Sequence, residues 1–306
     1  MGVSILMIFV YHIILFYERY TGIGLPVIDE LTAKGYIGVD IFMFLSAYGL
    51  SFSYEKNNLK RFYFHRFSRL YPMYGYFLCL LFLILYAFAE VHFSLSEIIW
   101  VSVFQFTGLA VFSFLNCEME WFMPSLIILY VCFPLIFRLV KIIIRRYGSK
   151  GELFLILFSL LGGILMKGII YENLAYRFPL IVTALIFYFR RDSLEHLFKL
   201  SIFCLICSVL TCRPLLENSM IIPVFMVVLC FLNISSFVCD NFLKFIGAHT
   251  LEIYLAQVIT TKYIMNFRLS NNNILMEFII VFVLTVFFSY ILYITHFYSL
   301  KCFLRK

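Results

Sequence analysis

Apolar runs of helix length follow one another along almost the whole chain, separated by short polar segments. Eleven such runs are visible, at residues 2–17, 35–53, 71–89, 95–112, 121–139, 152–170, 178–189, 199–212, 219–237, 251–267 and 274–296. A helix that crosses the hydrocarbon core of a bilayer needs about 20 residues, with about 17 as a practical minimum. The pattern therefore predicts an all-α, polytopic membrane helix bundle, although several runs are marginal in length.

Positive charges indicate which runs cross the membrane. Lys and Arg gather in residues 55–70 and again in residues 138–150, and such clusters mark cytoplasmic segments. Two cytoplasmic segments are separated by an even number of crossings, yet three runs lie between these two. The run at 95–112 contains Gln105 and Thr107 and has acidic flanks, so we expect a short half-helix on the outer side. About ten transmembrane helices then remain, with both termini cytoplasmic and most Lys and Arg inside.

Composition agrees with a lipid environment. Of 306 residues, 63% are hydrophobic and 13% are charged, whereas a soluble domain has about 25% charged residues. Abundant Phe and Tyr with few Gly and Pro favour helices over an outer-membrane barrel. The net charge is +7, and the positively charged residues lie between the apolar runs. They therefore indicate the orientation of the protein in the membrane and not nucleic-acid binding. We expect one domain, residues 1–306, that passes through the plasma membrane many times.

Several common chemistries find no motif in the sequence. Nine cysteines are scattered, and the single C-x-x-C, at Cys204 and Cys207, lies within an apolar run, where cysteines are usually small hydrophobic residues. We expect no disulfide framework and no metal site. The sequence has no G-x-S-x-G, H-E-x-x-H or phosphate-cradling glycine loop. The first run lacks the basic leader and cleavage site of a signal peptide, so it is predicted to be a membrane helix.

His12 is the first candidate for chemistry. It lies within ILMIFVYHIILFY, and at ~1.5 Å per residue it is about 16 Å from a cytoplasmic Met1. An ionisable group near the bilayer centre is costly, and it usually faces the bundle interior or a wet cavity. Two interpretations remain open: a catalytic general base, or a structural histidine that is hydrogen-bonded to a neighbouring helix.

Five further positions complete the set of candidates. Asp40, in an apolar run, needs a partner, which could be a His, an Arg or a backbone group. Arg66 and Arg69 are three residues apart, so in a helix they share a face and present two guanidinium groups to one phosphate-bearing ligand. The alternative for this pair is a lipid-headgroup patch that sets orientation. Trp121 is most simply an aromatic-belt residue, and Glu252 either lines a cavity or lies at the membrane interface.

In combination and in order, these segments resemble the acyltransferase-3 family. The resemblance covers about residues 7–78, 121–136 and 246–257. It rests on five blocks: FVYHIILF, GVDIFMFLSAYGLSF, YFHRFSRLYPMY with its R-x-x-R and Tyr-Pro, WFMPSLIILYVCFPLI and IGAHTLEIYLAQ. The N-terminal third carries the most specific part of the match.

The resemblance implies a ten-helix bundle that transfers an acetyl group from acetyl-CoA to a hydroxyl of a cell-envelope glycan, with no permanently bound cofactor. In that function His12 is the base at the acceptor hydroxyl, and Arg66 and Arg69 hold the phosphates of coenzyme A. Asp40 orients or charge-balances His12 or a neighbouring cation. Substrate contacts at Trp121 and Glu252 complete the predicted site.

Three departures from the family pattern bear on this hypothesis. Met1 stands where the family usually has an Arg, eleven positions before the His, which suggests a start upstream or the loss of the first residues. Leu126 replaces a Glu that many members carry. The sequence has no fused extracellular hydrolase-like domain, so an acetyl group would pass directly to the acceptor or to a separate protein.

Two competing hypotheses belong to other classes. A proton-coupled transporter or flippase for an amphiphile would use His12 and Asp40 as proton-relay groups. The sequence shows none of the paired Gly- or Pro-interrupted spans that such transporters have. A catalytically inactive scaffold is suggested only by Met1 at the position of the expected Arg.

Overall fold

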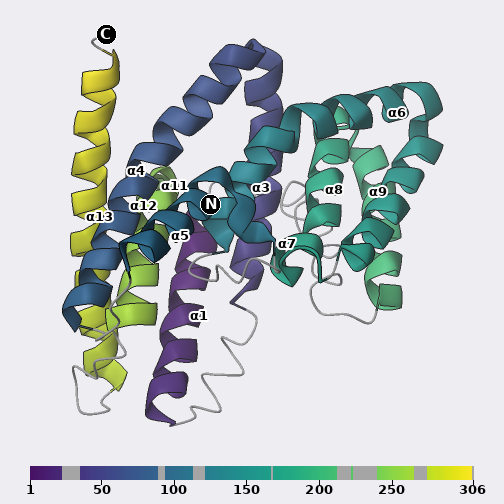
Figure 1. Cartoon of the computed structure of the whole chain (residues 1–306). Helices are drawn as coiled ribbons and strands as arrows, with labels where there is room; N and C mark the ends of the chain where they lie inside the picture. Colours follow the sequence, from purple (N-terminus) through teal and green to yellow (C-terminus); the bar gives the residue numbers. More distant parts are fainter. Residues whose placement is uncertain are drawn as a thin grey trace. The chain divides into compact units, whose positions relative to one another are not determined.

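The computed structural model describes residues 1–22, 35–88, 94–112, 121–166, 168–211, 222, 240–264 and 274–304. This part of the chain is almost entirely helical, and a single isolated bridge joins Phe112 to Ile170 within it (Figure 1). The elements are α1 (Gly2–Thr21), α3 (Ile37–Lys56), α4 (Leu59–Phe88), α5 (Leu95–Thr107), η1 (Leu109–Val111), α6 (Phe122–Leu165), α7 (Glu172–Ala175), α8 (Phe178–Phe189), α9 (Leu194–Thr211), α11 (Asp240–Ala248), α12 (Thr250–Gln257), η4 (Val258–Ile264) and α13 (Ile274–Leu304). The predicted all-α fold is confirmed.

Several helices are long and apolar enough to cross a membrane. In the described residues five helices meet this requirement, α1, α3, α4, α6 and α13, and the bent pair formed by α11 and α12 with η4 supplies a sixth candidate. The predicted run at 219–237 lies outside the described residues except at residue 222. The total of ten spans therefore stays a prediction.

The run at 95–112, which was predicted to form a half-helix, contains the short helix α5. α5 has 13 residues, too few to cross a bilayer. It begins with a capping box, in which the Ser94 backbone N–H donates to the Glu97 carboxylate (2.8 Å) and the Ser94 hydroxyl accepts the Glu97 N–H (3.3 Å). The bonds from the Ser94 backbone and hydroxyl lower the pKa of Glu97. That α5 lies on the outer side stays a prediction.

α6 contains two of the predicted runs. Its 44 residues are interrupted at Gly148, where φ is 54° and ψ is −134°. Glycine suits this conformation because a side chain would be strained at positive φ. The break lies within the basic segment 138–150, so the boundary between the predicted runs 121–139 and 152–170 coincides with a break in the helix.

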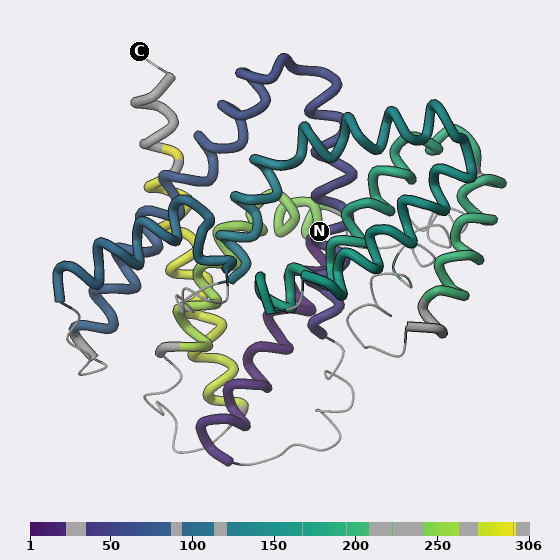
Figure 2. Tube along the Cα trace, turned by 45° about the vertical axis from the view of Figure 1, so that its right-hand side comes forward, coloured from purple at the N-terminus to yellow at the C-terminus, as the bar shows by residue number. Residues whose placement is uncertain are grey.

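The described chain divides into two compact units by its internal contacts, and each is described by itself. The first unit comprises Met1–Val39, His65–Ile99 and Cys239–Lys306. In it, α1 packs against α11, α12, η4 and α13 (Figure 2). The first turn of α3 lies against α1, because a Cβ at Gly38 would be 2.5 Å from the Ser4 carbonyl oxygen. The glycine of the GVD block is therefore explained by close helix packing.

The second unit comprises Asp40–Phe64 and Trp100–Val238. α8 is its central element, since every residue from Pro179 to Tyr188 is buried and the helix packs along α6. Aromatic rings fill the space around it; for example, the centroids of Phe137 and Phe189 are 4.9 Å apart. A helix that is apolar on all sides is expected in such a core position. That the two units form one domain stays a prediction.

Candidate functional site

Asp40 has an arginine as its partner. It lies in the first turn of α3, and its carboxylate accepts a hydrogen bond from the Nε–H of Arg177. The two side chains are 0% and 2% exposed. Arg177 directly precedes α8, which starts with a proline in its first turn. Among the three partners that the sequence left open, the structure selects an Arg, and the result is a buried ion pair.

The Arg177 guanidinium brings Asp40 together with Trp121. Its central carbon lies 5.3 Å from the centroid of the Trp121 ring, within the range of a cation–π interaction. Its Nη1 donates to the Asn173 carbonyl oxygen at 2.8 Å. The second carboxylate oxygen of Asp40 is buried and has no hydrogen-bond partner among the described residues. Sequence reasoning missed Arg177 because it stands at the edge of an apolar run, like an ordinary flanking charge.

His12 lies on α1 between two aromatic neighbours. Its ring centroid is 5.7 Å from that of Tyr11 and 6.1 Å from that of Phe16. Its Nδ1 is buried and has no hydrogen-bond partner in the described part of the chain, so the structural alternative of an interhelical bond finds no support at this atom. Lys262 on η4 is close enough for its charge to act on the imidazole. A buried ring nitrogen without a partner is available for proton transfer.

Gln257 is a second buried polar group that sequence reasoning missed. It ends α12 and is fully buried, and neither atom of its side-chain amide has a hydrogen-bond partner among the described residues. The next residues form the π-helix η4, a conformation that is frequent at functional sites. A buried amide without hydrogen-bond partners lowers stability, so Gln257 is a candidate for hydrogen bonding to a ligand. The available signal was a glutamine within an apolar run.

Arg66 and Arg69 both lie on α4. This helix begins after Asn58, whose side-chain oxygen accepts the backbone N–H of Arg61 at 2.8 Å. Because they are three positions apart in one helix, the two arginines share a face as predicted. Arg69 is exposed, and its Nη2 donates to the Ala248 carbonyl oxygen at 2.9 Å. The helical arrangement of the pair is confirmed; nothing in the structure tests phosphate binding.

Glu252 lines a cavity next to a helix break. The helices before and after His249 are bent by 67°. Glu252 is 3% exposed, and its Oε1 lies 3.9 Å from Nδ1 of His249. Both side chains line a cavity of about 420 Å³ that has mostly aromatic and aliphatic walls, with Phe245 and Phe282 among them. The structure thus favours the cavity-lining interpretation of Glu252.

The candidate residues fall into two groups, one in each unit. The first unit holds His12, Gln257, Glu252, Arg66 and Arg69, and the second holds Asp40, Arg177 and Trp121. Within the described ranges, no three His, Cys, Asp or Glu side chains gather closely enough to hold a metal ion. The polar groups available for chemistry are therefore an imidazole, an amide, carboxylates and guanidinium groups.

Comparison with known proteins gives one match. A family model described as an acyltransferase domain, Acyl_transf_3, matches residues 2–294. No curated protein and no solved structure matches the chain. The match spans nearly all of the sequence and includes every candidate residue named above. With its apolar helices of membrane-spanning length, the chain belongs to the acyltransferase-3 family of membrane acyltransferases.

Proposed function

We propose that this protein is an O-acyltransferase of the plasma membrane that moves an acetyl group from acetyl-CoA to a hydroxyl of a cell-envelope or extracellular polysaccharide. The single observation that supports it most is the buried Nδ1 of His12, which has no hydrogen-bond partner in the described residues of a chain from an acyltransferase family. Such a nitrogen has a lone pair without a partner, which a general base needs in order to accept the proton of an acceptor hydroxyl.

The reaction requires one proton to move and one ester to form. Acetyl-CoA docks from the cytoplasm with its phosphates on Arg66 and Arg69, because guanidinium groups bind phosphate bidentately. His12 takes the proton of the acceptor hydroxyl as the oxygen attacks the thioester carbonyl. The new C–O bond forms, the C–S bond breaks, and the imidazolium returns its proton to the departing thiolate.

The remaining candidates take supporting roles in this proposal. The Gln257 amide donates a hydrogen bond from Nε2 to the substrate, which would satisfy one of its two unpaired polar atoms. Glu252 contributes to the substrate cavity. Asp40 is a positioning residue, because its carboxylate binds Arg177 and fixes the guanidinium against Trp121. The neighbouring cation that Asp40 balances is thus Arg177.

A glycan assay tests the proposal. The protein is produced in a host with a defined surface polysaccharide, and O-acetyl groups are measured by proton NMR for the wild type, His12→Ala, Arg69→Ala and the control Arg146→Ala. Arg146 is an exposed arginine on α6 outside the candidate site. Acetylation that is lost in the first two variants and kept in the control supports the proposal.

Two results would contradict it. Equal acetylation by His12→Ala and the wild type, at equal membrane abundance, would exclude His12 as the base. Failure of the purified protein to bind coenzyme A, together with no acetylation, would exclude acetyl-CoA as the donor and favour the transporter hypothesis.

A further inference from the structure

The second unit contains a basic cavity that the proposed reaction does not use. Its volume is about 500 Å³, and it lies beside the helix break at Gly148 and the turn between α8 and α9. Four cationic side chains line it, against two carboxylates: Lys141, Arg145, Arg190 and Arg191 against Glu55 and Asp192. The segment 138–150, which supplies two of the cations, is predicted to be cytoplasmic, so we expect the cavity at the inner surface of the membrane.

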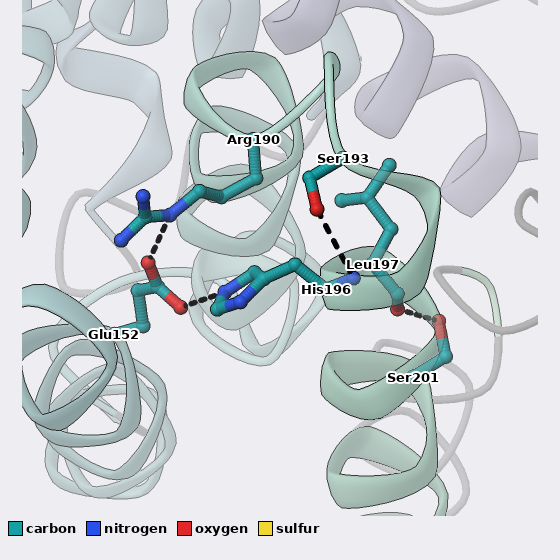
Figure 3. Close-up of polar contacts among 6 residues, drawn as sticks. All are labelled: Glu152, Arg190, Ser193, His196, Leu197 and Ser201. Carbon is teal, nitrogen blue, oxygen red and sulfur yellow. Dashed lines mark hydrogen bonds and ion pairs between the residues drawn. The ribbon is translucent and has the colours of Figure 1, made fainter.

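Arg190 is held in place by a buried carboxylate. Glu152, only 2% exposed, accepts the Nε–H of Arg190 at 2.5 Å. The other oxygen of the same carboxylate lies 2.6 Å from Nε2 of His196 (Figure 3). Figure 3 shows the ion pair at the Nε edge of the guanidinium, with the two terminal nitrogens away from His196. One edge of Arg190 is therefore fixed, and its terminal nitrogens are left for a ligand.

Arg191 is held by aromatic rings. Its guanidinium carbon lies 4.4 Å from the centroid of Tyr188 and 5.3 Å from that of Phe52. Its Nη1 donates to the Tyr188 carbonyl oxygen at 3.2 Å. The Tyr188 hydroxyl in turn donates to Glu55 at 2.6 Å, and Glu55 binds Lys141 at 3.2 Å. These contacts fix the cations before a ligand arrives, which lowers the entropy lost on binding.

The charges around the cavity leave one cation without a nearby carboxylate in the described part of the chain. Arg145, on α6, is exposed and makes no ion pair with any residue that the structure describes. A phosphodiester carries one negative charge, whereas a phosphate monoester carries about 1.5–2 at pH 7. The charge balance therefore favours a phosphodiester as the ligand. The other three cations each have a carboxylate close by, in the pairs Lys141 with Glu55, Arg190 with Glu152 and Arg191 with Asp192.

The face of α6 that leads to Arg145 is apolar and exposed. Val131, Leu135 and Ile142 are 49%, 63% and 59% exposed. Successive spacings of four, seven and three residues, ending at Arg145, place all four side chains on one face of the helix. Since α6 is long and apolar enough to cross a membrane, this face is suited to contact with lipid chains. The cation thus stands at the end of an apolar stripe.

We propose that this cavity binds the headgroup of an anionic phospholipid of the inner leaflet, whose acyl chains lie along the apolar stripe of α6. Guanidinium groups form charge-assisted hydrogen bonds with phosphate oxygens, and basic pockets between membrane helices on the cytoplasmic side bind anionic headgroups. A zwitterionic lipid is disfavoured because its own ammonium group would lie among the cations. The site is independent of acetyl transfer and of the residues assigned to it.

The chain offers a matched control for Arg145. Its neighbour Arg146 is also exposed but does not line the cavity, and its guanidinium lies 5.5 Å from the Tyr147 ring centroid. Purified full-length protein in a neutral detergent is titrated with dioleoyl phosphatidylglycerol, with dioleoyl phosphatidylcholine and with glycerophosphoglycerol, the soluble headgroup without acyl chains. Bound ligand is measured by native mass spectrometry for the wild type, Arg145→Ala, Arg145→Glu, Arg146→Ala and Arg146→Glu.

We expect the wild type to bind phosphatidylglycerol more tightly than the other two ligands. Arg145→Ala should weaken that binding about 10-fold, as the loss of a hydrogen bond to a charged group implies, and Arg145→Glu should weaken it further. Both Arg146 variants should bind like the wild type. Because Arg145 is exposed, its variants should keep the melting temperature of the wild type, which excludes unfolding as the cause of weaker binding.

Three results would overturn the proposal. Equal affinity for phosphatidylglycerol and phosphatidylcholine would show that the cavity does not recognise an anionic headgroup. Equal binding by the Arg145 and Arg146 variants would place the lipid away from this cavity. Binding of glycerophosphoglycerol as tight as that of phosphatidylglycerol would mean that the cavity takes a soluble phosphodiester and not a lipid.

Discussion

Asp40 and Arg177 are 137 residues apart in the sequence, yet their side chains form a hydrogen-bonded ion pair that is nearly closed to solvent. Taking charges out of water is expensive, and their attraction offsets this cost only while both are present. The pair links the start of α3 to the start of α8. The change in the free energy of unfolding when either partner is replaced therefore measures how much this pair stabilises the second unit.

Removing one partner should cost far more than removing both. We expect Arg177→Met to lower the free energy of unfolding by about 3–5 kcal/mol because it leaves the Asp40 carboxylate buried without its cation. The double variant Arg177→Met with Asp40→Leu should recover most of that loss. Thermal unfolding of Arg177→Met, Asp40→Leu and the double variant in one detergent measures the coupling energy between the two side chains. Additive effects of the two single changes would show that the charges do not act as a pair.

His12 should affect the chemical step more than binding. We expect His12→Asn to lower the rate of acetyl transfer by about 10²–10⁴-fold, the usual contribution of a general base, with little change in the affinity for coenzyme A. Steady-state rates and calorimetry on the same preparation separate these quantities. A proportional loss of affinity and rate would instead point to a structural role for the imidazole.

Replacing Gln257 should keep or raise the stability of the protein and lower its activity. Replacing it with Met, of similar length, removes two buried polar atoms without partners in the described residues, so the free energy of unfolding should stay equal or rise by about 1 kcal/mol. Acetyl transfer should fall because the substrate loses a hydrogen bond. Gln105, which is buried on α5 in the second unit, provides the control position. A Gln257→Met protein that is markedly less stable would mean that the amide is satisfied.

Two glycines should respond to alanine in opposite directions. Gly148 has φ of +54° and open space around an added Cβ, so Gly148→Ala should cost about 1–2 kcal/mol through backbone strain alone. Gly49 is within α3 and also has open space, so Gly49→Ala should stabilise the protein by up to about 1 kcal/mol. Melting temperatures measure both. Stabilisation at Gly148 would indicate that the two parts of α6 join differently.

Much of the fold could be predicted because apolar runs leave a membrane protein few alternatives. The predicted run at 178–189 coincides with α8, and the run at 95–112 contains the short helix α5. Backbone groups in lipid must be satisfied within the segment, so hydropathy fixes the type of element. It does not fix where a helix begins: α4 starts at Leu59, well before the predicted run at 71–89.

The site could be predicted only as separate residues. The sequence singled out Asp40 and Trp121, but the arginine between them stood at the edge of a run and had no distinguishing pattern. Its pairing depends on tertiary contacts across 137 positions. Gln257 was missed for a related reason. Whether a buried amide is satisfied depends on its neighbours in space, which a hydropathy pattern does not contain.

The continuity of α4 gives the arginine pair a fixed register. Arg66 and Arg69 precede Pro72 in one uninterrupted helix of 30 residues, so they cannot swing as side chains on a loop would. Each residue of a helix adds about 1.5 Å of length and about 100° of rotation. A single residue inserted between Leu70 and Tyr71 would turn the guanidinium of Arg69 away from the apolar half of its own helix by roughly a quarter of a circle. The number of residues in this helix thus sets the direction in which it presents its two arginines.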